Sequence, residues 1–233
     1  DKLVEQGVEV HVFDDLSTGF LENVNSKAHF HKMDISEVDP ETLSEYMEGV
    51  DTVFHTASKT RVQPSITDPG SYHKVNVTGT LNMLMASVKV GVKRFVYSAS
   101  SSAYGDSDIM PLVETMPTNP MSPYGMTKYL GEEYCKLFYS QYGLETVNLR
   151  YFNVYGERQN LDGGYCLVIG TFAKQRMQGE PMTIVGDGEQ RRDFTYVGDV
   201  VNANLAAATS GKVGSGEIIN VGNGDNRTIN QIA

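Results

Sequence analysis

The alternation of apolar and polar side chains near the start of the chain predicts a β-strand. Over residues 8–13 three valines alternate with polar residues, and a period of two places the two kinds of side chain on opposite faces of a strand. This strand would end at Asp14. Residues 1–6 are typical of the last turn of a helix, which Gly7 would terminate.

Segments with the periods of strands and helices then alternate along the chain. Further strands are expected at residues 30–34, 51–56, 94–98 and 146–152. Helices, each ended by a glycine, are expected at residues 39–49, 71–90 and 122–142. Because short connections join the alternating strands and helices, the sequence predicts a doubly wound, Rossmann-type α/β fold with a parallel sheet and right-handed crossovers.

Polar and small residues follow several of the expected strands at the point where each strand ends. They are Asp14, Asp34, Ala57 with Ser58, Ser100, and Tyr151 to Asn153. In open parallel sheets ligands bind beyond the carboxyl ends of the strands. Core residues lie mostly within strands, so this distribution favours a ligand site at that edge of the sheet.

The pattern changes after Gly156, which suggests a second, smaller unit. Loop residues are expected at 157–164, helices at 168–178 and up to about 208, and strands at 192–197 and 217–221. We therefore divide the chain into a nucleotide-binding unit of residues 1–156 and a partial substrate-binding unit of residues 157–233. Strand 217–221 is a candidate to return to the first sheet.

Composition narrows the classes of function. The chain of 233 residues is 40% apolar and 21% charged, as is usual for globular proteins. Its net charge of −10 argues against a nucleic-acid partner. It contains no apolar run long enough to span a bilayer and no secretory signal, so we expect a cytoplasmic protein without a membrane partner.

Cysteine and histidine do not form an expected metal site. The two cysteines, Cys135 and Cys166, show no metal or disulfide spacing and are expected to be reduced. The five histidines are scattered, with His29 and His31 sharing at most one face of a strand. No metal is predicted.

The segment from Ser122 to Lys128 carries the clearest candidate chemistry. Ser122 is a good helix N-cap, and Pro123 fits the first helical position. Tyr124 and Lys128 then lie four residues apart on one helical face. A phenol with a pKa near ~10 is a poor base at neutral pH, but a neighbouring ammonium or a bound cationic ring would lower that pKa. The alternative is a helix face that simply carries a Tyr and a Lys.

Asp14 fits the acidic residue that binds the adenosine ribose in dinucleotide-binding units, which follows the glycine-rich turn by about 20 residues. Only 13 residues precede it, so we expect the first strand and the glycine-rich turn to lie outside this sequence. Without the helix N-terminus at that turn we expect weak NAD binding. Asp14 could alternatively be only a turn or capping residue.

Together these segments resemble the extended short-chain dehydrogenase/reductases, and within them the nucleotide-sugar 4-epimerases, of which UDP-glucose 4-epimerase is one. Eight ordered stretches of the sequence carry the resemblance: 12–19 (VFDDLSTG), 34–35 (DI), 55–58 (HTAS), 76–80 (NVTGT), 98–105 (SASSSAYG), 122–128 (SPYGMTK), 149–156 (LRYFNVYG) and 186–197 (GDGEQRRDFTYV). Family members usually run on past the position of Ala233, so we expect an incomplete substrate domain.

The resemblance implies roles for particular residues. The catalytic residues would be Ser100, Tyr124 and Lys128, with Ser101 and Ser102 as neighbouring alternatives for the serine. The residues that bind the NAD cofactor would be Asp14, Asp34, Ile35, Ala57, Asn76, Tyr124, Lys128 and Tyr151. The residues that bind the UDP-sugar would be Ser100, Asn153, Val168 and Arg192. For Arg192 the alternative is a surface ion pair with Asp193 or Glu189.

The implied activity is the NAD-dependent 4-epimerisation of UDP-glucose and UDP-galactose through a 4-keto sugar, a reaction of galactose metabolism. Related dehydratases and decarboxylases carry an acid in the serine loop, where this chain has only hydroxyls. Asp14 without a nearby Arg favours NAD over NADP. UDP-N-acetylglucosamine and UDP-glucuronate stay open as substrates, and a truncated, noncatalytic nucleotide-binding fragment stays open as a second class.

A homodimer is also open. On the helix of residues 122–142, Leu130, Tyr134 and Leu137 form a second apolar stripe beside the one that continues from Tyr124. The family's dimers pack through this helix and its neighbour. Coverage of the stripe by the helix of residues 71–90 is the alternative.

Overall fold

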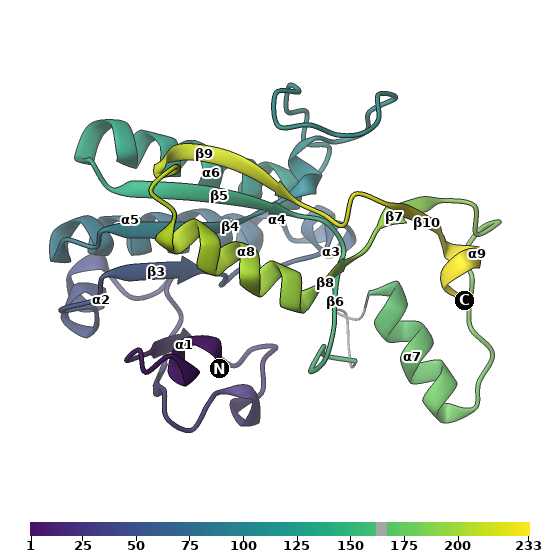
Figure 1. The fold of residues 1–233 in the computed structure, drawn as a ribbon, viewed down its shortest axis with the longest axis horizontal. Coiled ribbons are helices and arrows are strands. Elements are labelled where there is room, and N and C mark those ends of the chain that lie inside the picture. The colour runs from purple at the N-terminus through teal and green to yellow at the C-terminus, as the bar shows by residue number, and fades with distance from the viewer. Residues whose placement is uncertain (162–166) are drawn as a thin grey trace.

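Four parallel strands form the main sheet of the protein (Figure 1). The computed structural model describes residues 1–161 and 167–233. In spatial order the strands are β3 (Thr52–His55), β4 (Arg94–Ser100), β5 (Glu145–Tyr151) and β9 (Ser215–Val221). Every neighbouring pair runs in parallel, so the carboxyl ends of the four strands lie along one edge.

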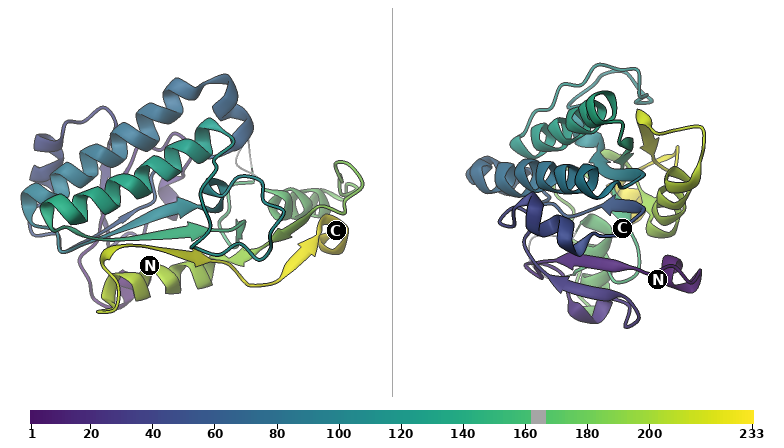
Figure 2. Two further views of the ribbon diagram at one scale, coloured as in Figure 1. Left: turned by 90° about the horizontal axis from the view of Figure 1, so that it is seen from above. Right: turned by 90° about the vertical axis from the view of Figure 1, so that its left-hand side faces the viewer.

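Helices cover both faces of this sheet (Figure 2). The helices on one face are α2 (Pro40–Tyr46), α5 (Gly79–Val90) and α6 (Pro123–Tyr142), and the helix on the other is α8 (Val197–Thr209). Two apolar clusters fill the interfaces, one around Phe95 and Tyr97 and the other around Val96 and Val147. Successive residues of β4 thus point into opposite layers, as the pleat of a strand requires.

A second parallel pair lies beside the main sheet. It consists of β1 (His11–Asp14) and β2 (His29–Lys32), which follow the short helix α1 (Lys2–Glu5). Within the part of the chain that is described, β1 and β2 hydrogen-bond only to each other and not to the four-stranded sheet.

The remaining elements are short. Those between β3 and β4 are α3 (Val62–Thr67), α4 (Pro69–His73) and a π-helical turn (Lys74–Thr78). Those beyond β5 are β6 (Val154–Tyr155), α7 (Val168–Gln178), β7 (Arg191–Asp193), β8 (Thr195–Tyr196), β10 (Asn226–Thr228) and α9 (Ile229–Ile232). Single 3₁₀ turns occupy Leu21–Asn23 and Ser101–Ala103. Figure 1 shows α7, β7, β10 and α9 as a lobe at one end of the sheet.

The predicted α/β architecture is confirmed, and several element boundaries need correction. The helix predicted at 71–90 is continuous, and a π-helical turn at Lys74–Thr78 joins α4 to α5 within it. Strand β4 continues to Ser100, two residues beyond the predicted end. The strand predicted at 192–197 is two short strands separated at Phe194.

Residues beyond 156 contribute both to the layers of the main sheet and to the lobe at its end. Helix α8 covers one face of the main sheet, and β9 pairs with β5. The division of the chain at residue 156 stays a prediction. No helix among the described residues has the length and apolar character needed to cross a membrane.

Helix α6 packs on the sheet through a buried face that carries glycine. Ser122 caps its start by accepting from the Gly125 N–H at 3.0 Å, and Gly143 ends it in the left-handed conformation with φ +70°. At Gly131 a Cβ would lie 2.2 Å from the Tyr97 hydroxyl oxygen. Any side chain at this position would therefore push α6 away from β4.

Replacing Gly131 with alanine should destabilise the protein by about 1–3 kcal/mol, because overpacking a closed interface forces side chains or backbone to shift. Urea unfolding would measure this loss. The matched control is Gly70→Ala in α4, where an added Cβ meets nothing within 4 Å; it should change stability by less than about 1 kcal/mol. Equal stability of the two variants would contradict the close approach of α6.

Candidate active site

Ser100 and Tyr124 meet at the carboxyl edge of the main sheet. Ser100 is the last residue of β4, and Tyr124 lies in the first turn of α6. The Ser100 hydroxyl lies near enough to the Tyr124 phenol to lower its pKa. Gly125 makes this approach possible, because a Cβ there would lie 2.8 Å from the Ser102 carbonyl oxygen. The two residues are 24 positions apart in the sequence, and the structure brings them together at the start of α6.

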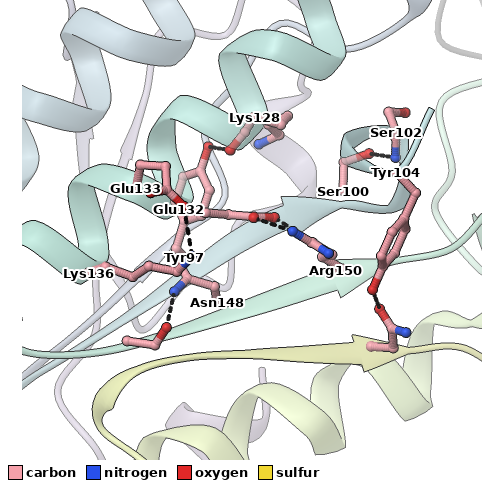
Figure 3. Close-up of polar contacts among 12 residues, drawn as sticks. Tyr97, Ser100, Ser102, Tyr104, Lys128, Glu132, Glu133, Lys136, Asn148 and Arg150 are labelled. Atoms are coloured by element: carbon pink, nitrogen blue, oxygen red, sulfur yellow. Dashed lines mark hydrogen bonds and ion pairs between the residues drawn. The ribbon is translucent and has the colours of Figure 1, made fainter. Parts of the chain in front are cut away.

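The serine loop itself is held by local hydrogen bonds. The Ser100 hydroxyl accepts from the Ser102 N–H at 3.2 Å (Figure 3). Ser100 is buried, while Ser101 and Ser102 are half-buried in the following 3₁₀ turn. Of the three serines, Ser100 is the one that lowers the pKa of Tyr124.

Burial raises the pKa of Tyr124, and the hydrogen bond with Ser100 opposes that rise. The expectation that Lys128 lowers the pKa of this phenol is not met in the structure. The Lys128 ammonium instead donates to the Ser98 carbonyl oxygen at 2.8 Å. The reason is geometric: residues four apart share a helical face, but this Lys side chain extends inward to β4.

Lys128 is itself an unusual cation, because only 4% of its surface is exposed. Its Nζ lies 5.1 Å from the centroid of the Tyr97 ring. Burial lowers the pKa of Lys128 to about 8, and the negative charge of Glu132 opposes this shift. Lys128 thus loses its charge more readily than a solvent-exposed lysine does.

Glu132 and Arg150 form a buried ion pair one helical turn beyond Lys128 (Figure 3). Arg150 donates from Nε and Nη2 to the two carboxylate oxygens at 2.8 and 2.6 Å. Its guanidinium carbon lies 4.4 Å from the centroid of the Tyr104 ring, and its Nη1 has no hydrogen-bond partner in the described structure. The pair joins α6 to β5 directly beneath the candidate site.

Glu132 and Arg150 were not among the predicted site residues. A signal was present, because Glu132 lies four residues after Lys128 and would share its helical face. Its burial could not be inferred from that spacing, since a surface position is the ordinary place for Glu.

A second region at the same sheet edge collects residues predicted to bind the cofactor. A pocket of about 90 Å³ is lined by Asp14, Asp34, Ile35 and Ala57, together with Ser17, Thr18 and Lys59. These residues come from the ends of β1, β2 and β3. The chain segments that carry them are up to 45 residues apart in sequence, yet they border one cavity.

The chemistry of this pocket fits the adenosine half of a dinucleotide. Asp14 accepts from the Leu16 N–H at 2.7 Å through Oδ1, and no partner of Oδ2 is found among the described residues. A free carboxylate oxygen suits a ribose diol. Ile35 supplies an apolar wall, and Lys59 supplies a cation for a phosphate.

Asn76 and Tyr151 occupy supporting positions instead of lining that pocket. Asn76 is 1% exposed, accepts from the Lys59 N–H at 2.7 Å, and donates to the Lys59 carbonyl and to Thr127 Oγ1. With its amide engaged in this way, Asn76 positions the loop after β3, and its predicted contact with the cofactor stays a prediction. The Tyr151 hydroxyl is likewise held, by Ser98 Oγ at 3.2 Å and Asn204 Nδ2 at 2.7 Å.

The predicted substrate residues other than Ser100 line a larger pocket of about 300 Å³. Asn153 follows β5, Val168 begins α7, and Arg192 lies in β7. Asn153 donates to the Asp193 carbonyl at 2.8 Å and so ties the end of β5 to β7. Part of the neighbouring loop, residues 162–166 with Cys166, lies outside the described residues.

Arg192 presents a cation at this pocket. Its side chain is exposed and donates only to the Arg191 carbonyl at 2.7 Å, and it has no carboxylate partner within residues 1–161 and 167–233. The alternative ion pair with Asp193 does not form, because the Asp193 carboxylate accepts from the N–H groups of Asn223 and Gly224. A forked guanidinium in this state suits a phosphate or diphosphate.

The sequence matches the NAD dependent epimerase/dehydratase family over residues 1–222. The chain belongs to this family. UDP-glucose 4-epimerase of Mycolicibacterium smegmatis is 37% identical over 231 residues, which cover 96% of this chain and 72% of that protein. NAD is the family's cofactor, and the residues around Asp14 fit it.

Solved structures of family members agree closely with the fold. UDP-glucose 4-epimerase of Thermotoga maritima, in complex with UDP-glucose, is 40% identical with a TM-score of 0.94, over 100% of this chain and 74% of that one. UDP-N-acetylglucosamine 4-epimerase of Methanobrevibacter ruminantium, in complex with UDP-N-acetylmuramic acid, is 36% identical with a TM-score of 0.93 and the same coverage. The chain is therefore an epimerase-type enzyme with a Rossmann-type fold.

The buried pair Glu132–Arg150 generates a stability prediction. Glu132→Gln should lower the free energy of unfolding by about 3–5 kcal/mol, because it leaves the Arg150 charge buried without a counterion. The matched control is Glu133→Gln on the same helix, whose partner Lys136 is 2.7 Å away with a side chain 40% exposed. Loss of this solvent-exposed pair should cost about 1 kcal/mol or less.

Urea unfolding of both variants would measure the difference. A double variant, Glu132→Leu with Arg150→Met, should recover much of the lost stability, since it removes both buried charges together. Equal effects of the Glu132 and Glu133 substitutions would show that the buried pair does not hold α6 to β5.

Proposed function

We propose that the protein interconverts UDP-hexoses at C4, with UDP-glucose and UDP-galactose as its substrates. The observation that carries the proposal is the nearness of the Ser100 hydroxyl to the Tyr124 phenol at the carboxyl edge of the sheet, where the serine lowers the pKa of the phenol. Two hydroxyl groups in contact can share one oxygen of a bound alcohol. The similarity to UDP-glucose 4-epimerases over nearly the whole chain supports the same substrate class.

Tyr124 is the proposed base, and it acts on the sugar 4-hydroxyl. In the structure burial raises its pKa, so the phenolate requires further positive charge nearby. Bound NAD would supply that charge on its nicotinamide ring and would accept and return the hydride at C4. Ser100 orients the same sugar oxygen and stabilises the phenolate by its hydrogen bond.

Lys128 is proposed to act on the cofactor side of the site. Its ammonium donates to the Ser98 carbonyl, which leaves two of its three N–H donors for a ribose hydroxyl. Glu132 opposes the effect of burial and so favours the charged form of Lys128. Lys128 therefore contributes a positive charge to cofactor binding, and the neighbouring Glu132–Arg150 pair helps to keep Lys128 charged.

The UDP group is proposed to bind in the pocket lined by Asn153, Val168 and Arg192. The unpaired Arg192 cation matches the charge of a diphosphate. Firm binding of the nucleotide leaves the sugar free to present either face at C4. UDP-N-acetylglucosamine is the second candidate substrate, since a 4-epimerase for that sugar matches the whole chain with a TM-score of 0.93.

Tyr124→Phe should reduce the rate of UDP-galactose epimerisation by about 10²- to 10⁴-fold, the usual contribution of a positioned acid–base group. The conversion would be followed by separating UDP-glucose from UDP-galactose in the presence of NAD. Tyr139→Phe on the exposed side of the same helix is the matched control and should retain the full rate. Near-normal epimerisation by the Tyr124 variant would refute the proposed mechanism.

A panel of UDP-sugars would then rank UDP-galactose against UDP-N-acetylgalactosamine and UDP-galacturonate. The protein-bound NAD should be measured by fluorescence in the same samples. Bound NAD without turnover of any sugar would favour a noncatalytic nucleotide-binding protein.

We also propose a homodimer formed through α5 and α6. These helices lie side by side on one face (Figure 2), and their exposed residues include Met85 and Leu137, at 47% and 48% exposure. Leu130 and Tyr134 on the same stripe of α6 are half-buried by the rest of the chain. Coverage by α5 thus leaves an apolar strip that a second copy could bury.

Leu137→Lys should shift the protein to a monomer, because a buried charge in the centre of an isologous interface is repeated in both copies. Sedimentation velocity would report the change. Met177→Lys in α7, a position that is 81% exposed, is the control and should leave the assembly unaltered. A monomeric parent protein would refute the dimer.

A further inference from the structure

Four residues that can bind metal ions lie together on β1, β2 and the residues before β1. They are Glu9, His11, His29 and His31. The histidines were expected to be scattered, and that expectation is wrong for these three. The parallel register pairs His11 with His29 and Phe13 with His31, so residues about 20 positions apart share one face of the pair.

The distances among these side chains suit a coordinated ion. Glu9 Oε1 lies 3.3 Å from His11 Nε2 and 3.6 Å from His29 Nε2. Ligand bonds of about 2.1 Å at tetrahedral angles separate two ligand atoms by about 3.4 Å. One ligand atom from each of the three residues lies within 4.8 Å of the others. A small rotation of the exposed His29 side chain would bring all three to one centre.

His31 completes the arrangement by contacting His11 on the side away from Glu9 Oε1. Its Nε2 lies 3.0 Å from His11 Nδ1, and the two rings stack with an interplanar angle of 7°. At this distance His31 Nε2 can accept the Nδ1–H of His11, which fixes the tautomer that leaves His11 Nε2 free for a metal.

The aromatic rings of Phe13 and Tyr46 hold His31 in this position. Both contact its ring edge-on, with centroid separations of 5.2 Å. The packing of α2 against β1 and β2 therefore fixes the position of the His31 ring, whose Nε2 is the acceptor for His11. Metal sites whose ligand orientation is fixed in this way bind more tightly.

We propose that Glu9, His11 and His29 bind one divalent transition-metal ion, with zinc as the best match, and that His31 orients His11. Two imidazoles and a carboxylate are usual zinc ligands, and the exposed fourth position would hold water. The ion would tie the residues before β1 to β2. The proposed metal site lies at the amino ends of β1 and β2, whereas the candidate active site lies at the carboxyl ends of the strands. Metal binding should therefore stabilise the β1–β2 pair without taking part in the reaction.

Isothermal titration of the tag-free protein with Zn²⁺ tests the proposal. We expect saturable binding of one ion, weakened at least tenfold by each of His11→Ala, His29→Ala and Glu9→Gln. His31→Phe, which keeps the ring between Phe13 and Tyr46, should weaken binding about 10- to 100-fold. The control His73→Ala removes an exposed histidine from α4 and should leave the affinity unchanged.

Two further measurements keep the result independent of folding. Cobalt(II) in place of zinc should give visible absorption bands that disappear in the His29→Ala variant. Zinc should raise the melting temperature of the parent protein and of His73→Ala, but not that of His29→Ala. Absence of saturable binding, or equal binding by the His29 and His73 variants, would overturn the proposal.

Discussion

The close docking of α6 on the main sheet is the constraint on which the candidate site depends. Two glycines on the buried face let the helix approach β4 and the serine loop. The same face then carries Lys128 and Glu132 into the interior, where Arg150 meets Glu132 through two hydrogen bonds. Buried charges are tolerated only when they are paired. The ion pair therefore fixes the distance of α6 from the sheet and the rotation of α6 about its own axis, and with them the position of Tyr124.

This docking has a direct consequence for the chemistry. Burial disfavours the charged forms of both Tyr124 and Lys128, so it raises the pKa of the phenol and lowers that of the ammonium. Neither group is set for proton transfer by the protein alone. The site is complete only when the charge of the cofactor and the oxygen of the sugar enter it, which links the proposed proton transfer to the presence of both ligands.

The residues around the cofactor pocket are of two kinds: some line the pocket, and others hold the lining residues in position. Asn76 was predicted to bind the cofactor, yet its amide is engaged with the Lys59 backbone and Thr127. Lys59 in turn lines the cofactor pocket. The motif therefore marks the region of this pocket, while the assignment of Asn76 to the cofactor itself stays a prediction. A sequence pattern does not distinguish direct contact from support one residue away.

The sequence by itself determined the order of elements, the parallel α/β class, the capped start of α6 and the gathering of ligand residues at the strand ends. These follow from backbone periodicity and local capping, which act within a few residues. Only the tertiary structure decided the Lys128–Ser98 contact, the Glu132–Arg150 pair and the cluster around His11. Each depends on partners 18 or more positions away, and the first two depend also on burial away from water. Neither property is encoded in local spacing.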